Sequence, residues 1–122
     1  MAKTILVVDD SASIRQVVGI ALRGAGYDVI EASDGKDALG KMTGQKIHLI
    51  ISDVNMPNMD GITFLKNVKA NPQYKFTPVI MLTTEAGQDK MAEGKAAGAK
   101  AWVVKPFQPP QMLDAVAKLV LP

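Results

Sequence analysis

Five side chains with the chemistry of a phosphoryl-transfer site occur directly after apolar runs of this sequence. They are Asp9, Asp10, Asp53, Thr83 and Lys105. A carboxylate can attack phosphorus and form an aspartyl phosphate. The transferred group then has to be neutralised and positioned, which ammonium, hydroxyl and metal-bound groups can do. The sequence therefore raises the question of whether the fold brings these five residues together.

Five short apolar runs predict β-strands. They are TILVV (4–8), DVIEA (28–32), HLIIS (48–52), PVIML (78–82) and AWVV (101–104). Four of these runs are nearly continuous in aliphatic residues, which is typical of strands buried on both faces. The run at 28–32 is more polar and is predicted to be an edge strand. Apolar residues at three- and four-residue steps predict helices between the runs.

Because strands and helices alternate along the chain, we predict an α/β fold, a (βα)5 unit with a doubly wound parallel five-stranded sheet. Right-handed crossovers favour the flavodoxin-like strand order 2-1-3-4-5. The first and third strands are neighbours in that order, and ligands bind at the carboxyl ends of the strands. The carboxylates that follow these two strands are therefore expected to converge at one edge of the sheet.

The helix boundaries are predicted from capping residues. Ser13 and Gln16 have the spacing of a capping box at the start of the first helix. Asp60 is the predicted cap of the third helix. The stretch 87–98 is the weakest helical pattern, because it has few large apolar residues and carries Gly94 in its middle. A glycine there costs roughly 1 kcal/mol relative to alanine.

Length and composition predict one globular domain spanning residues 1–122, with no output domain. The net charge of +2 is too small to indicate nucleic-acid binding. The absence of cysteine excludes disulfides and thiolate metal sites. The start of the chain does not have the pattern of a signal peptide, and no apolar run approaches the ~20 residues of a membrane span. We therefore expect a cytoplasmic protein without nucleic-acid or membrane partners, and a monomer is the default for a single domain.

The predicted cluster of carboxylates requires a counterion. Two charges 4 Å apart repel by about 4 kcal/mol at an effective dielectric constant near 20. Lys105 is one cation and does not neutralise three anions, whereas Mg²⁺ prefers oxygen ligands and retains waters. If Asp9 and Asp10 hold the metal, Asp53 is the remaining carboxylate, and we predict it to be the nucleophile.

Four segments, in this order, resemble the receiver domain of two-component response regulators. They are VVDDS (7–11), LIISDVNMPNMDG (49–61), VIMLTTE (79–85) and WVVKPF (102–107). The resemblance covers essentially the whole chain. It implies a signalling switch that accepts a phosphoryl group from a histidine kinase in the presence of Mg²⁺. It implies no enzymatic role beyond self-catalysed phosphorylation and autodephosphorylation.

The resemblance also implies the roles of the residues around the metal. Asp53 is the phosphoacceptor. Asp9, Asp10, Asp53 and the backbone carbonyl of Asn55 are the implied metal ligands, and Lys105 contacts the phosphoryl group. The side chain of Asn55 is implied to tune the rate of dephosphorylation.

The remaining implied roles belong to the ends of the last two strands. Thr83 is the switch hydroxyl, and Thr84 follows it where the family more often has a smaller residue. Trp102 occupies the position of the switch aromatic, commonly Tyr or Phe. Glu85 joins Asn55 in tuning dephosphorylation, and a cis peptide is implied at Lys105–Pro106.

As a stand-alone receiver with Asn55 and Glu85, the chain is most similar to chemotaxis-type receivers. The implied downstream partner is a protein, as in flagellar motor control, bound by the predicted helix within 87–98, the strand 101–104 and the last helix. A phosphorelay intermediate or a phosphate sink is an alternative. A Mg²⁺-dependent aspartyl-phosphate phosphohydrolase is less favoured, because no D-x-D follows the first strand. A flavin-binding module is disfavoured by the acidic DDSAS turn.

Overall fold

The computed structural model describes residues 2–83, 88–105 and 108–120, except for the side chains of 88–91. Strands and helices alternate along the chain. In order, they are β1 (Thr4–Val8), α1 (Ala12–Gly24), β2 (Asp28–Ala32), α2 (Gly35–Lys41), β3 (Leu49–Asp53), α3 (Gly61–Ala70), β4 (Val79–Thr83), α4 (Gln88–Ala96), β5 (Ala101–Val104) and α5 (Pro109–Leu119).

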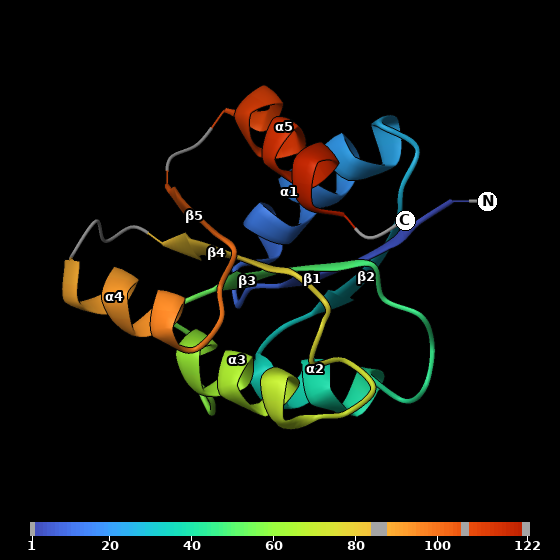
Figure 1. Ribbon diagram of the computed structural model, residues 1–122. Helices are drawn as coiled ribbons and strands as arrows, with labels where there is room; N and C mark the ends of the chain where they lie inside the picture. Colours follow the sequence, from blue (N-terminus) through green and yellow to red (C-terminus); the bar gives the residue numbers. More distant parts are fainter. Residues whose placement is uncertain (1, 84–87, 106–107, 121–122) are drawn as a thin grey trace.

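The strands form one parallel sheet in the order β2-β1-β3-β4-β5. Helices α1 and α5 cover one face of the sheet, and α2, α3 and α4 cover the other (Figure 1). This is the predicted flavodoxin-like topology, and β2 is the predicted edge strand. Three layers are what a parallel sheet requires, because both of its faces have to be buried.

The core consists of two clusters on opposite faces of the sheet. Successive residues of a strand point to opposite faces. Leu6 and Val8 of β1 therefore pack with α2 and α3, whereas Ile5 and Val7 pack with α1 and α5. Strands β1, β3 and β4 are almost fully buried. These strands form a rigid base for the residues at their carboxyl ends.

Strands β3 and β4 each begin and end one residue later than predicted. Asp53 pairs with Leu82, and Thr83 pairs with Val104, so the ladder continues through both polar residues. Strand ends are defined by hydrogen bonding to the neighbouring strand rather than by apolar character. Asp53 and Thr83 are therefore held by the sheet itself, instead of lying in the loops that follow it.

The predicted start of the first helix was wrong. The N-cap is Ser11, whose hydroxyl accepts a hydrogen bond from Ile14 N at 3.3 Å, and α1 begins at Ala12. Asp9 Oδ1 accepts a hydrogen bond from Ser11 N at 2.9 Å, which fixes the turn before the helix. The predicted cap of α3 is confirmed, because Asp60 Oδ1 accepts a hydrogen bond from Thr63 N at 2.7 Å.

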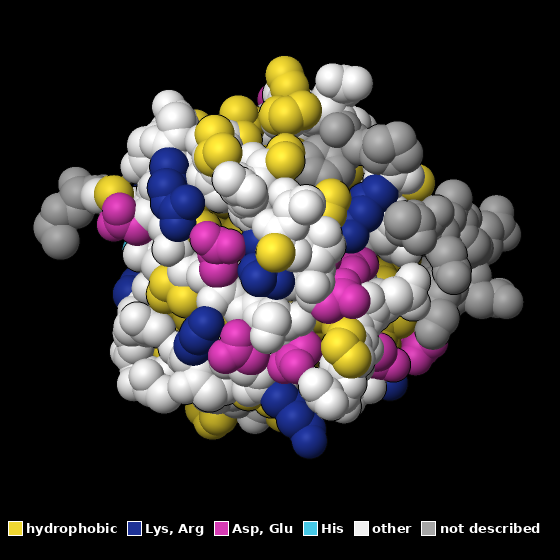
Figure 2. Space-filling model, turned by 180° about the vertical axis from the view of Figure 1, so that it is seen from behind, with side chains coloured by type: hydrophobic (Ala, Val, Ile, Leu, Met, Phe, Trp, Pro, Cys, Tyr) yellow, Lys and Arg dark blue, Asp and Glu magenta, His cyan; other side chains and the backbone are white. Residues whose placement is uncertain are grey.

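Helix α4 has the weak amphipathic pattern that the sequence indicates. Gly94 is buried, whereas its neighbours Glu93 and Lys95 are exposed. Within the described residues, no helix combines the length and apolar character needed to cross a membrane. The face of the molecule in Figure 2 shows basic and acidic side chains interspersed among uncharged ones.

Candidate functional site

Three carboxylates come together at the carboxyl edge of the sheet. One oxygen from each of Asp9, Asp10 and Asp53 lies within 4.8 Å of the others. Asp9 and Asp53 are only 1% and 6% exposed, whereas Asp10 faces solvent. The convergence follows from the topology, because β1 and β3 are adjacent and parallel.

Lys105 lies between two of these carboxylates. Its ammonium is 2.9 Å from Asp9 Oδ2 and 3.5 Å from Asp53 Oδ1. Its backbone N donates to the carbonyl of Thr83 at 2.6 Å, which holds the residue against the end of β4. One ammonium beside three carboxylates leaves the cluster with excess negative charge.

The electrostatics of the cluster favour the uptake of a cation. Burial raises the pKa of Asp53, and the nearby Asp9 charge raises it further. Lys105 and the backbone N–H of Asn55 lower the pKa of Asp53, but they do not cancel the rise. A close set of oxygen donors with excess negative charge suits a hard divalent ion such as Mg²⁺.

Residues 5–117 match the family model of the response regulator receiver domain. The chain belongs to this family. It is 36% identical over 116 residues to the chemotaxis protein CheY-3 of Vibrio cholerae, a match that covers 94% of this chain and 89% of that protein. Protein PilG of Pseudomonas aeruginosa is 38% identical over 112 residues, covering 92% of this chain and 83% of that protein.

The fold of this receiver domain is similar to that of a solved chemotaxis protein. The structure of Vibrio cholerae CheY4 superposes with a TM-score of 0.94 at 49% identity, covering 98% of this chain and all of that one. Together with the relatives, this similarity makes the chain a chemotaxis-type receiver. Its general role is phosphorylation-dependent signalling.

The loop after β3 holds Asp53 tightly against α3. A Cβ atom on Gly61 would lie 2.0 Å from the backbone oxygen of Asp53, so only glycine fits there. Asn58 has a positive φ of 66°, and its Nδ2 donates to Asp34 Oδ2 at 2.8 Å. Asn55 is exposed in this loop. The loop therefore approaches the end of β3 more closely than an ordinary side chain would allow.

Thr83 lies at the same edge of the sheet as the acidic cluster, whereas Trp102 packs against α4. Thr83 ends β4 and is fully buried at the carboxyl edge. Trp102 pairs with Met81 in the sheet and packs against the α2–α3 side of the core. A Cβ on Gly94 would lie 2.5 Å from its ring, so the indole contacts α4. Its Nε1 is buried without a hydrogen-bond partner in the described part of the chain.

Three of the predicted site residues lie outside the described residues. They are Thr84, Glu85 and Pro106. The predicted cis peptide at Lys105–Pro106 and the predicted tuning role of Glu85 therefore stay predictions.

The sequence reasoning missed three residues that position the site. Ser11 caps α1 beside Asp9, and Gly61 allows the close approach to Asp53. Arg15 Nη1 donates to the backbone oxygen of Asp9 at 2.5 Å and belongs to the same turn. Two of these residues could have been predicted from the sequence. Ser11 is a serine directly after the paired aspartates, and Gly61 is an isolated glycine at the start of a helical pattern.

Proposed function

We propose that Asp53 accepts a phosphoryl group from a phosphohistidine of a histidine kinase, and that the resulting change alters affinity for a protein partner in chemotaxis, as in flagellar motor control. The observation that carries this proposal is the bridging position of Lys105 between Asp9 and Asp53. A cation in this position can compensate charge on a group transferred to Asp53. The membership in the receiver family supports the same chemistry.

Asp9, Asp10, Asp53 and the backbone carbonyl of Asn55 are the proposed ligands of Mg²⁺. The mutual approach of the three carboxylates within 4.8 Å and the raised pKa of Asp53 support this assignment. When bound, the metal supplies positive charge that neutralises phosphoryl oxygens. Asp10 is the exposed member of the set, so a metal can reach the site from solvent.

The chemical step is a transfer between two nucleophiles. A carboxylate oxygen of Asp53 forms the new P–O bond while the P–N bond of the phosphohistidine breaks. The kinase imidazole leaves with the bonding electrons and then takes up a proton. Lys105 and the hydroxyl of Thr83 are proposed to contact the phosphoryl oxygens, and Asn55 and Glu85 are proposed to tune later attack by water.

The proposed response passes from the carboxyl edge to the surface formed by α4, β5 and α5. Thr83 is the last residue of β4, which is paired with β5. Trp102 extends from β5 to α4. A rearrangement of Thr83 toward the phosphoryl group can therefore be transmitted to α4 through the indole. We propose this surface for the downstream partner of a monomeric receiver.

Labelling with acetyl phosphate and Mg²⁺ tests the nucleophile. We expect stoichiometric labelling of the wild type and none of Asp53→Asn. Asp28→Asn is the matched control, because Asp28 is an exposed carboxylate at the opposite edge of the sheet. Undiminished labelling of Asp53→Asn would remove Asp53 from its proposed role. Multiple turnover of other phosphomonoesters would favour the phosphohydrolase.

Thermal unfolding with and without Mg²⁺ tests the metal ligands. A ligand that binds only the folded state raises its stability. Mg²⁺ is expected to raise the midpoint of the wild type, and Asp10→Ala should abolish this rise. An equal rise in Asp10→Ala would exclude Asp10 as a ligand.

The pH dependence of the metal-free protein tests the electrostatics. A raised pKa means that the folded state holds the Asp53 proton more tightly than the unfolded state does. The resulting stabilisation is present below the ordinary pKa of 3.8 and is lost as the pH rises through the raised value. Asp53→Asn should therefore unfold at a higher temperature than the wild type at neutral pH. Below pH 3.8, the difference in unfolding temperature between the variant and the wild type should be smaller. An unchanged difference across this range would contradict the crowding of carboxylates.

A phosphorelay intermediate remains distinguishable from a receiver that acts on a terminal target. Passing labelled phosphate from Asp53 to a histidine phosphotransfer protein would favour the relay. Phosphorylation-dependent binding to a motor component, without onward transfer, would favour chemotaxis.

A further inference from the structure

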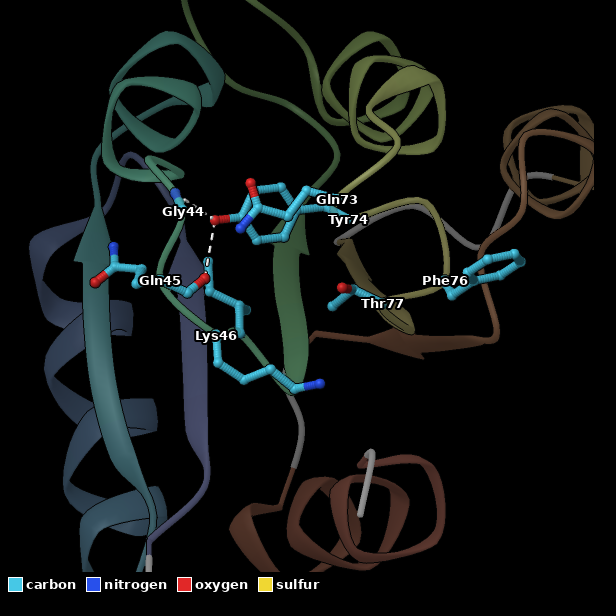
Figure 3. Close-up of a pocket in the computed structure, with 8 residues that line it drawn as sticks. Gly44, Gln45, Lys46, Gln73, Tyr74, Phe76 and Thr77 are labelled. Atoms are coloured by element: carbon cyan, nitrogen blue, oxygen red, sulfur yellow. Dashed lines mark hydrogen bonds between the residues drawn. The ribbon is translucent and has the colours of Figure 1, made fainter.

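A hollow lies at the amino edge of the sheet, opposite the acidic cluster. It is formed by residues 44–47, which precede β3, and by residues 73–77, which precede β4, and it encloses about 280 Å³. We call it the amino-edge pocket. Figure 3 shows the side chains of Tyr74 and Lys46 on different sides of the hollow, with Phe76 further along the second segment.

The two walls of the amino-edge pocket are tied together by one buried tyrosine. The hydroxyl of Tyr74 accepts a hydrogen bond from Gly44 N at 3.1 Å and donates one to the carbonyl of Gln45 at 2.9 Å (Figure 3). Tyr74 is 2% exposed. Because both hydrogen-bonding capacities of the hydroxyl are used, the hollow is preformed and does not need a ligand to open it.

Lysines gather around this pocket. Lys46 lines it, and Lys75 lies in its second wall between Tyr74 and Phe76. Lys69 Nζ donates to the carbonyls of Lys75 and Thr77, which places its charge directly behind that wall. Within the described residues, no carboxylate lies within ion-pair distance of these three ammonium groups.

A fourth lysine adds to the positive potential. Lys100 N donates to the carbonyl of Val79, so Lys100 lies at the start of β5 beside the start of β4. Burial lowers the pKa of Lys69, and the charge of Lys100 lowers it further. The part of the amino edge that precedes β3 and β4 therefore carries positive charge, in contrast to the negative carboxyl edge.

The rim of the pocket also has the most exposed large hydrophobic side chain of the described residues. Phe76 is 79% exposed. The ammonium of Lys75 lies 5.0 Å from the centre of its ring, on one face. An exposed aromatic ring beside the ammonium of Lys75 offers an apolar contact and a charge contact within one small area.

We propose that the amino-edge pocket docks an acidic segment of a partner protein, with an apolar side chain against Tyr74 and Phe76 and carboxylates on Lys46 and Lys75. The charge of the pocket selects acidic partners. Its concave shape selects a projecting side chain, which a flat membrane surface does not offer. The segment would bind at the end of the sheet opposite Asp53, so docking there leaves the phosphoacceptor accessible.

The probe is the acetylated and amidated peptide Asp-Glu-Phe-Glu-Asp, titrated at low salt into the full ¹⁵N-labelled chain and followed by amide chemical shifts. We expect the shifts to concentrate at 44–47 and 73–77 and to weaken as salt is added. The peptide Lys-Lys-Phe-Lys-Lys should cause no shifts there. The titration should give the same result with Asp53→Asn, which separates this site from the proposed phosphorylation.

Two variants test the residues that are proposed to bind. The double variant Lys46→Glu/Lys75→Glu and the single variant Phe76→Ser should each weaken peptide binding by about tenfold. All three side chains are exposed, so the variants are expected to fold. Lys36→Glu/Lys118→Glu is the matched control, because it makes the same charge change at exposed positions elsewhere and should bind the peptide almost as the wild type does.

Three results would overturn the proposal. The first is the absence of shifts at the pocket up to the solubility limit of the peptide. The second is equal weakening by the control variant, which would indicate only net charge. The third is stronger binding at the same amides by phosphatidylserine vesicles or by a single-stranded oligonucleotide, which would indicate a lipid or nucleic-acid surface instead.

Discussion

Helices α3 and α4 lie on the same face of the sheet (Figure 1), and each contains a glycine that has no room for a side chain. At Gly61, the missing Cβ would meet the backbone of Asp53 at 2.0 Å. At Gly94, it would meet the ring of Trp102 at 2.5 Å. A backbone held in a sheet does not move aside, whereas an indole can rotate. The first contact is therefore fixed, and the second is adjustable.

The packing of the two helices agrees with this difference. Helix α3 buries four large apolar side chains, Ile62, Phe64, Leu65 and Val68. At the positions of α4 whose exposure is described, 92–96, only Gly94 is buried. The loop of the proposed phosphoacceptor thus rests on a firmly anchored helix, and the proposed partner surface includes a loosely anchored one. A switch needs both, because the chemistry requires fixed geometry and the response requires movement.

The largest effect is expected for Gly61→Ala. The new methyl group forces the end of β3 and the start of α3 apart, which should reduce the free energy of unfolding by about 3 kcal/mol. Labelling by acetyl phosphate should fall as well, because Asp53 is displaced. Urea unfolding and labelling are the measurements. Wild-type values in both would show that the backbone contact is not rigid.

A smaller effect is expected for Gly94→Ala. The methyl group should push the indole of Trp102 toward solvent, with a loss of buried area that outweighs the roughly 1 kcal/mol gained in helix propensity. We expect a net loss of about 1 kcal/mol and tryptophan emission at longer wavelength. Labelling of Asp53 should remain.

Gly40→Ala is the matched control for Gly94→Ala. Gly40 is a helical glycine in α2 with open space around its Cβ position. The substitution should raise stability by up to about 1 kcal/mol and leave the emission unchanged. If Gly94→Ala behaved in the same way, the contact between α4 and the indole would be unimportant.

The smallest effect is expected for Lys66→Gln. Lys66 of α3 and Glu93 of α4 are 3.8 Å apart, and both side chains are largely exposed. Exposed ion pairs contribute little to the stability of the fold, so the loss in the free energy of unfolding should stay below about 0.5 kcal/mol. A larger loss in a urea titration would mean that charge, rather than the indole, attaches α4.

The sequence predicted the topology because apolar runs and helical periodicity alternate clearly. It also predicted which side chains the carboxyl edge brings together, since strand order alone places Asp9 near Asp53. Strands β3 and β4 both begin and end one residue later than the sequence predicted, because the limits of a strand depend on its pairing with the neighbouring strand. The cap of α1 was misassigned because Ser11 and Ser13 both precede apolar residues, and the hydrogen bond from Ile14 N to the Ser11 hydroxyl, which identifies the cap, is seen only in the structure.

Two other features, the contact of Trp102 with Gly94 and the amino-edge pocket, could not be predicted from the sequence for a different reason. The burial of Trp102 under Gly94 depends on how a helix without an apolar stripe approaches the sheet. The amino-edge pocket depends on Tyr74 reaching a loop 30 residues earlier in the chain. Neither contact leaves a periodic pattern, because each involves a single side chain and a distant backbone.

The ion pair between Asp9 and Lys105 also bears on how the protein is synthesised. The two residues are separated by 96 positions in sequence, so the pair forms only after nearly the whole chain has been made. A nascent chain that has already paired β1 with β3 would hold Asp9 and Asp53 together without their lysine. In that intermediate, the two carboxylates would repel each other unless another cation lay between them. Lys105 directly follows β5, so the arrangement of Lys105 between Asp9 and Asp53 is complete only when the last strand has joined the sheet.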